Sequence, residues 1–135
     1  MIKKIILLSG DPNSINSELI FKSWKKINNR LRKKIYLISN YNLINKQFRK
    51  LNYKIKTIKV KSIDDKIKTN ELKILNVALN SKKTFDISKK KASKFIKESL
   101  DLAHELASTK KRCGIINCSI DKKLFKKKNI GVTEY

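Results

Sequence analysis

The segment KKIILLSGDPNSINSE, residues 3–18, decides the fold of this chain of 135 residues. An apolar run over residues 5–8 stops at Ser9, and residues typical of a tight loop and of a helix cap follow. This order predicts a buried strand, a loop and a helix. Ligands of open α/β sheets bind beyond the carboxyl ends of the strands, so the loop at residues 9–12 is a functional candidate by position.

The remaining sequence predicts further units of the same kind. Ser14, Asn16 or Ser17 is expected to cap the first helix, and Asn40 the second. Strands are predicted at 3–9, 34–39, 53–60, 72–79 and 112–117, and helices at 16–29, 41–51, 88–108 and 122–128, with loops at 61–71 and 118–121. Alternating polar residues in 53–60 indicate a strand near a sheet edge. The order β-α-β-α-β-β-α-β-α predicts one α/β unit over residues 1–135, with a largely parallel sheet flanked by helices.

The net charge of +23 is the most unusual bulk property. It favours binding to nucleic acid or to another polyanion. Arg is rare, however, and the Lys residues are spread along the chain together with many Ile and Asn, which is also the bias of an AT-rich genome. Two interpretations therefore remain open: a basic nucleic-acid-binding α/β protein, and compositional drift that leaves only non-specific, salt-sensitive binding to polyanions.

The absence of an export signal favours the cytoplasm. No apolar run approaches the roughly 18 residues of a membrane span, and the run near the N-terminus is shorter than a signal peptide requires. Cys113 and Cys118 are five positions apart in a predicted strand, which places them on opposite faces. We therefore expect two reduced thiols that neither pair nor share a metal.

Few residues suggest catalytic chemistry on their own. Three glycines in the whole chain exclude a glycine-rich phosphate cradle. The second strand exit, residues 118–122, offers a hydroxyl, an acid and Lys122, which could hold a phosphate or simply be solvated. Trp24 is expected in the core, and His104, the single histidine, borders the apolar stripe of a helix where a structural role is more common than catalysis.

Three segments resemble the N-terminal part of the 4-hydroxythreonine-4-phosphate dehydrogenase family of pyridoxal phosphate (vitamin B6) biosynthesis. The family opens with G-D/E-P-A-G-I-G-P-E, and this chain has GDPNSINSE at 10–18. The family later has T-A/G-P-I-N/H-K, and this chain has NCSIDK at 117–122. A third family motif, A-G-x-x-x-x-G-H-T-E-F/Y, resembles NIGVTEY at 129–135.

The resemblance implies a truncated isocitrate/isopropylmalate-dehydrogenase-like fold, the N-terminal portion of a larger two-domain enzyme. It also implies NAD-dependent oxidation and decarboxylation of a phosphorylated hydroxythreonine, a divalent metal and a homodimer. Thr133 and Lys122 would contact the substrate, and Val132 stands where the family has a substrate-binding His. The ligands for NAD and metal would lie outside this chain, so we expect neither metal binding nor catalysis from it alone. Because Val132 replaces a polar residue, a catalytically inactive paralogue is a further alternative.

Overall fold

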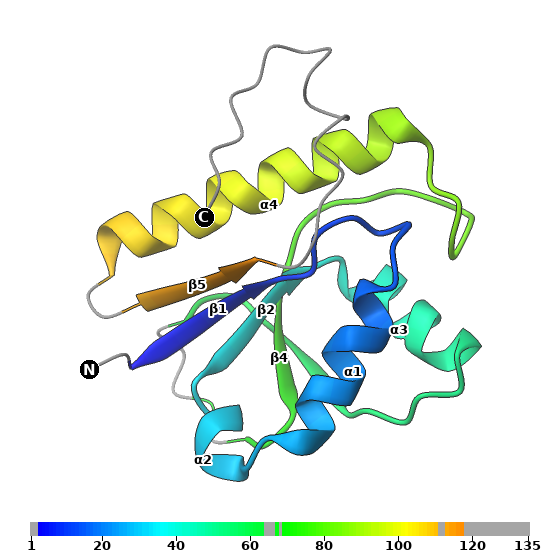
Figure 1. The fold of residues 1–135 in the computed structure, drawn as a ribbon. Helices are drawn as coiled ribbons and strands as arrows, with labels where there is room; N and C mark the ends of the chain where they lie inside the picture. The colour runs from blue at the N-terminus through cyan, green and yellow to red at the C-terminus, as the bar shows by residue number, and fades with distance from the viewer. Residues whose placement is uncertain (1–2, 64–66, 68, 111–112, 118–135) are drawn as a thin grey trace.

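The chain forms a five-stranded sheet in which every strand pair is parallel (Figure 1). The structure is a computed structural model that describes residues 3–63, 67, 69–110 and 113–117. Its elements are β1 (Lys4–Leu8), α1 (Asn16–Lys26), α2 (Asn29–Arg32), β2 (Ile35–Ser39), α3 (Tyr41–Lys50), β3 (Thr57–Val60), β4 (Leu72–Asn76), α4 (Lys89–Thr109) and β5 (Cys113–Asn117). The strand order is β3-β4-β2-β1-β5. The predicted α/β fold with a parallel sheet is confirmed.

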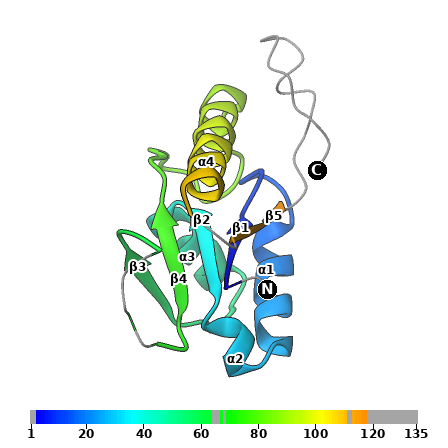
Figure 2. The same cartoon turned by 90° about the vertical axis from the view of Figure 1, so that its left-hand side faces the viewer.

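Helices cover both faces of the sheet (Figure 2). Helix α4 packs on the face that carries Tyr36 and Ile38, and α1 and α3 pack on the face that carries Ile35 and Leu37. Every residue of β2 is buried as a result. A strand covered on both faces reads as a continuous apolar run, which is why IYLIS shows no alternation.

The first predicted helix is divided in two. Helix α1 ends at Lys26, and α2 begins after Asn28, whose side chain accepts a hydrogen bond from the Leu31 N–H at 2.9 Å. Asn28 therefore starts a new helix where the sequence pattern predicts a continuous one. The predicted cap of α1 is only partly right: Ser14 Oγ accepts from the Asn16 N–H at 3.2 Å, but Ile15 occupies the cap position.

The third predicted strand is too long at its start. Only Thr57–Val60 form β3, which lies at the sheet edge as predicted. The preceding segment packs instead against α1, because the Tyr53 ring stacks on Phe21 with ring centroids 4.2 Å apart. An aromatic contact with a helix thus replaces strand pairing.

Several predictions lie outside the described residues. These are the loop at 118–121, the helix at 122–128, Cys118, and the three substrate-side positions Lys122, Val132 and Thr133. Within the described residues, Trp24 is buried as predicted and His104 is exposed on α4. No helix in this part of the chain combines the length and apolarity needed to cross a membrane.

Candidate functional site

The strand order reverses between β1 and β5, and this position defines the candidate site. From β1 the chain passes through α1 on one face to β2, whereas it reaches β5 through α4 on the opposite face. Leu8 and Asn117 are register partners at the carboxyl ends of these two strands. In open α/β sheets, ligands generally bind beyond the carboxyl ends of the strands at such a switch point.

The β1–α1 loop, residues 9–15, is organised by its own polar groups. Gly10 has a φ of 72°, a left-handed conformation that favours glycine. Asp11 Oδ1 accepts a hydrogen bond from the Asn13 N–H at 2.9 Å. The Asp11 carbonyl accepts from both the N–H and the hydroxyl of Ser14, at 3.2 and 2.8 Å. The Gly-Asp-Pro segment therefore builds a fixed turn.

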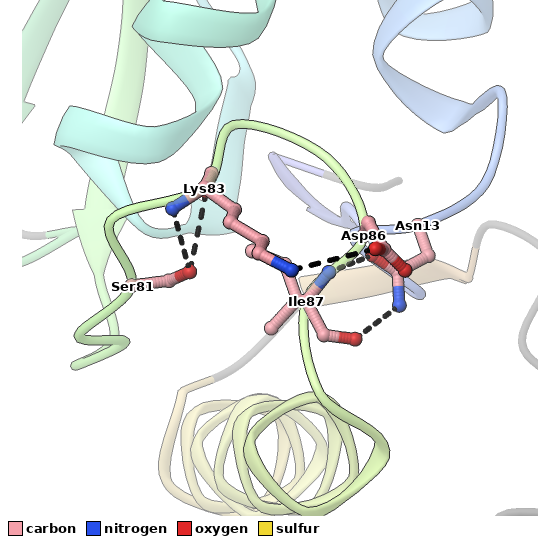
Figure 3. A network of polar contacts seen from close by, with 5 residues as sticks. All are labelled: Asn13, Ser81, Lys83, Asp86 and Ile87. Carbon is pink, nitrogen blue, oxygen red and sulfur yellow. Dashed lines mark hydrogen bonds and ion pairs between the residues drawn. The ribbon is translucent and has the colours of Figure 1, made fainter.

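Two amide side chains attach this loop to the β4–α4 loop, residues 77–88. Asn13 donates from Nδ2 to the Ile87 carbonyl at 2.8 Å and accepts from the Ile87 N–H at 2.6 Å (Figure 3). Gln47 on α3 donates from Nε2 to the carbonyls of Pro12 and Thr84, at 2.9 and 3.0 Å. We call Asn13 and Gln47 the amide clamps. They hold two loops at the carboxyl edge as one unit.

The space beneath the β1–α1 loop is nearly filled. A cavity of about 10 Å³ remains among Ser9, Asp11, Pro12, Asn16, Ser17, Ser39, Leu43, Ile44, Gln47 and Phe95. Ser17 Oγ is buried and has no hydrogen-bond partner among the described residues. The cavity has the size of about one water molecule, which that hydroxyl could bind. No ligand larger than about one water molecule fits beneath this loop.

A larger, cationic groove lies on the β4–α4 loop and the start of α4. Its volume is about 540 Å³, and it is lined by Asn80, Ser81, Lys82, Lys83, Asp86, Ser88 and Lys91. Lys83 and Asp86, both exposed, face each other at 3.6 Å (Figure 3). Ser88 caps α4 through its hydroxyl, which accepts from the Lys91 N–H at 3.3 Å. We call this the loop groove.

The electrostatics of the loop groove favour an anion. Three lysines and one carboxylate line the groove, and the first turn of α4 carries no acid. The N-terminal end of a helix is the positive end of its dipole, so lysine side chains at this end are repelled electrostatically. A bound anion would reduce this repulsion. Sequence reasoning missed this site because Lys82, Lys83 and Lys91 resemble the chain's many other lysines. The sequence signal that could have identified the site is the presence of lysines in the first turn of α4, where acidic residues are favoured.

The described residues do not provide a metal site. No group of three or more His, Cys, Asp or Glu side chains lies close enough to hold a metal ion in this part of the chain. The described residues therefore offer no ligand set for a divalent metal, and no reaction step is assigned to a metal held by them.

The parallel strand order, with helices on both faces of the sheet, defines an α/β fold. Three similar solved structures are described as 4-hydroxythreonine-4-phosphate dehydrogenases. The Salmonella typhimurium protein has a TM-score of 0.79 at 13% identity, and the match covers 100% of this chain and 42% of that one. The Burkholderia phymatum protein has a TM-score of 0.69 at 14% identity, covering 93% and 38%, respectively. The Klebsiella pneumoniae protein has a TM-score of 0.75 at 16% identity, covering 91% and 39%.

These likenesses agree with the family that the sequence motifs resemble, and at such identities they show the fold. The chain spans about two fifths of the length of the three solved structures. No protein-family model and no curated protein sequence matches it.

Proposed function

We propose that this chain is the N-terminal portion of a dehydrogenase that resembles 4-hydroxythreonine-4-phosphate dehydrogenase. One observation carries the proposal: the match to the Salmonella protein includes the whole chain, yet only 42% of that protein. The motif resemblance at 10–18, 117–122 and 129–135 supports it independently of the fold.

In this proposal the carboxyl edge of the sheet faces a phosphorylated small-molecule substrate. The loop groove, with Lys82, Lys83 and Lys91, offers cationic groups for an anionic part of that substrate. Lys122 and Thr133 are further substrate contacts carried over from the family motifs. Val132, in place of the family's His, removes one polar contact and alters the substrate preference.

The proposed reaction is the NAD-dependent oxidation and decarboxylation of 4-phosphooxy-threonine in vitamin B6 biosynthesis. NAD would accept the hydride and a divalent cation would polarise the oxygen of the oxidised carbon, both held by residues outside this chain. The amide clamps fix the loops against which the substrate would bind. A cytoplasmic homodimer of the larger enzyme completes the proposal.

An enzyme assay tests it. NADH formation from 4-phosphooxy-threonine is measured for the 135-residue chain and for the polypeptide encoded by the whole reading frame that contains it. We expect turnover by the longer polypeptide alone. Turnover by the short chain, or by neither polypeptide, would contradict the proposal.

A catalytically inactive paralogue is the second candidate, favoured by Val132 at the family's His position. It predicts that the longer polypeptide binds 4-phosphooxy-threonine without forming NADH. Calorimetric titration with the substrate separates binding from turnover, and substrate turnover with NADH formation excludes this candidate.

A further inference from the structure

A second cationic pocket lies at the opposite, amino edge of the sheet. It is formed by the end of α1, by α2 and by the segments that lead into β3 and β4. Its volume is about 450 Å³, and its lining consists of Phe21, Trp24, Lys25, Arg32, Lys54, Ile55, Lys56, Asn70 and Glu71. We call it the amino-edge pocket. Strands of a parallel sheet share one direction, so this pocket lies at the opposite edge of the sheet from the candidate site at the carboxyl ends.

Aromatic rings hold two of its cationic side chains in place. The Arg32 guanidinium lies over the Trp24 ring at 5.0 Å and donates from Nε and Nη2 to the Trp24 carbonyl, at 3.2 and 2.7 Å. Lys25 Nζ lies over the Phe21 ring at 4.8 Å. Cations held in this way lose little additional side-chain entropy when a ligand binds.

The charges of the amino-edge pocket are unbalanced. Four cationic side chains line it and Glu71 is the acid among its lining residues. Lys54 and Lys56 are exposed and have no ion pair within the part of the chain that the structure describes. Both hydrogen bonds of Arg32 use Nε and Nη2, so its Nη1 hydrogens remain available to a ligand.

We propose that the amino-edge pocket binds a small anion that carries two or more phosphate groups. The four cations come from α1, α2 and the segment before β3, so they surround the space rather than offer a single contact point. A volume of about 450 Å³ lies in the usual range of small-molecule sites. Arginine in a fixed orientation provides the paired N–H groups that phosphate oxygens accept.

The same surface is poorly suited to a nucleic-acid strand. Single strands bind by stacking bases on exposed aromatic faces. Trp24 and Phe21 are only 7% and 8% exposed, and a cation lies over each ring. The phosphates of a small ligand are therefore the better match. This inference does not depend on the proposed dehydrogenase function.

Trp24 provides the test, because it is the single tryptophan of the chain. The intrinsic fluorescence of the 135-residue chain is titrated with inorganic tripolyphosphate in about 0.15 M salt. The double variant Lys54→Gln/Lys56→Gln removes two exposed charges of the pocket without disturbing Trp24. The matched control, Lys46→Gln/Lys50→Gln, removes two exposed charges from α3, outside both the amino-edge pocket and the loop groove. Circular dichroism confirms that all three proteins are folded.

We expect saturable binding that the pocket variant weakens at least tenfold and the control variant less than threefold. Arg32→Gln should weaken it as well, with the melting temperature measured to exclude unfolding. Equal weakening by the two double variants, or no saturable binding, overturns the proposal. A parallel titration with a single-stranded RNA oligonucleotide tests whether the pocket binds the phosphates of RNA instead of those of a small ligand. If the pocket variant weakens RNA binding more than tripolyphosphate binding, the assignment of a small ligand is wrong.

Discussion

Replacement of Asn13 by Ala should separate the two loops at the carboxyl edge. The side chain makes two hydrogen bonds to the backbone of Ile87, a residue that is only 3% exposed. Each such bond contributes about 1 kcal/mol, so the variant should lose roughly 2 kcal/mol of unfolding free energy. Unfolding entropy of about 2.1 cal/mol/K per residue amounts to ~0.28 kcal/mol/K for 135 residues. The melting temperature should therefore fall by about 7 °C.

Calorimetry measures the change in melting temperature, and hydrogen exchange measures the local opening at Ile87. The Ile87 amide should be protected in the parent protein and exchange much faster in Asn13→Ala. Asn42→Ala is the matched control, since Asn42 is an exposed residue of α3, and its unfolding free energy should change by less than about 0.5 kcal/mol. If the two variants melt at the same temperature and the Ile87 amide stays protected, the clamp does not hold the loops.

Three other substitutions test the packing and the electrostatics of the fold. Burial, with a smaller effect from Lys4, lowers the pKa of Lys73 from 10.5. The unfolded chain therefore binds the proton of Lys73 more tightly than the folded chain does, and the free energy of unfolding rises with pH between the lowered pKa and 10.5. Urea titrations should show that Lys73→Met lacks this rise and is at least as stable as the parent at neutral pH. Phe48→Ala should cost about 3–5 kcal/mol in urea unfolding, because that side chain is 1% exposed in the core, and a loss below 1 kcal/mol would contradict the packing. The hydrogen bond from Lys22 lowers the pKa of Glu18, but the pair is exposed, so Glu18→Gln should leave the melting temperature unchanged within error in high salt.

The sequence was sufficient to predict the architecture, because strong local patterns specify it. The continuous apolar run of β2 and the long apolar stripe of α4 each indicate one type of element. The side chain of Asn40 accepts from the Leu43 N–H at 3.0 Å, as its position before a helix predicts. The break at Asn28 was missed because Leu31 continues the apolar spacing of α1 beyond the point where the helix ends.

Both binding surfaces depend on contacts that local patterns do not reveal. Asn13 and Ile87 are 74 positions apart, and no spacing rule connects an exposed amide with a distant backbone. Arg32, Lys54 and Lys56 line the same pocket because the Tyr53 ring stacks on Phe21 and places the segment before β3 next to α1. Lys122, Val132 and Thr133, which were chosen from motif resemblance, stay predictions because they lie outside the described residues.

The most direct test of the central claim is to read the source DNA beyond the codon for Tyr135. The claim is that this chain forms the first two fifths of a dehydrogenase-like enzyme. It predicts that the reading frame continues for at least another domain, with histidines that can bind a metal at the cleft between domains. A stop codon directly after Tyr135 would contradict it.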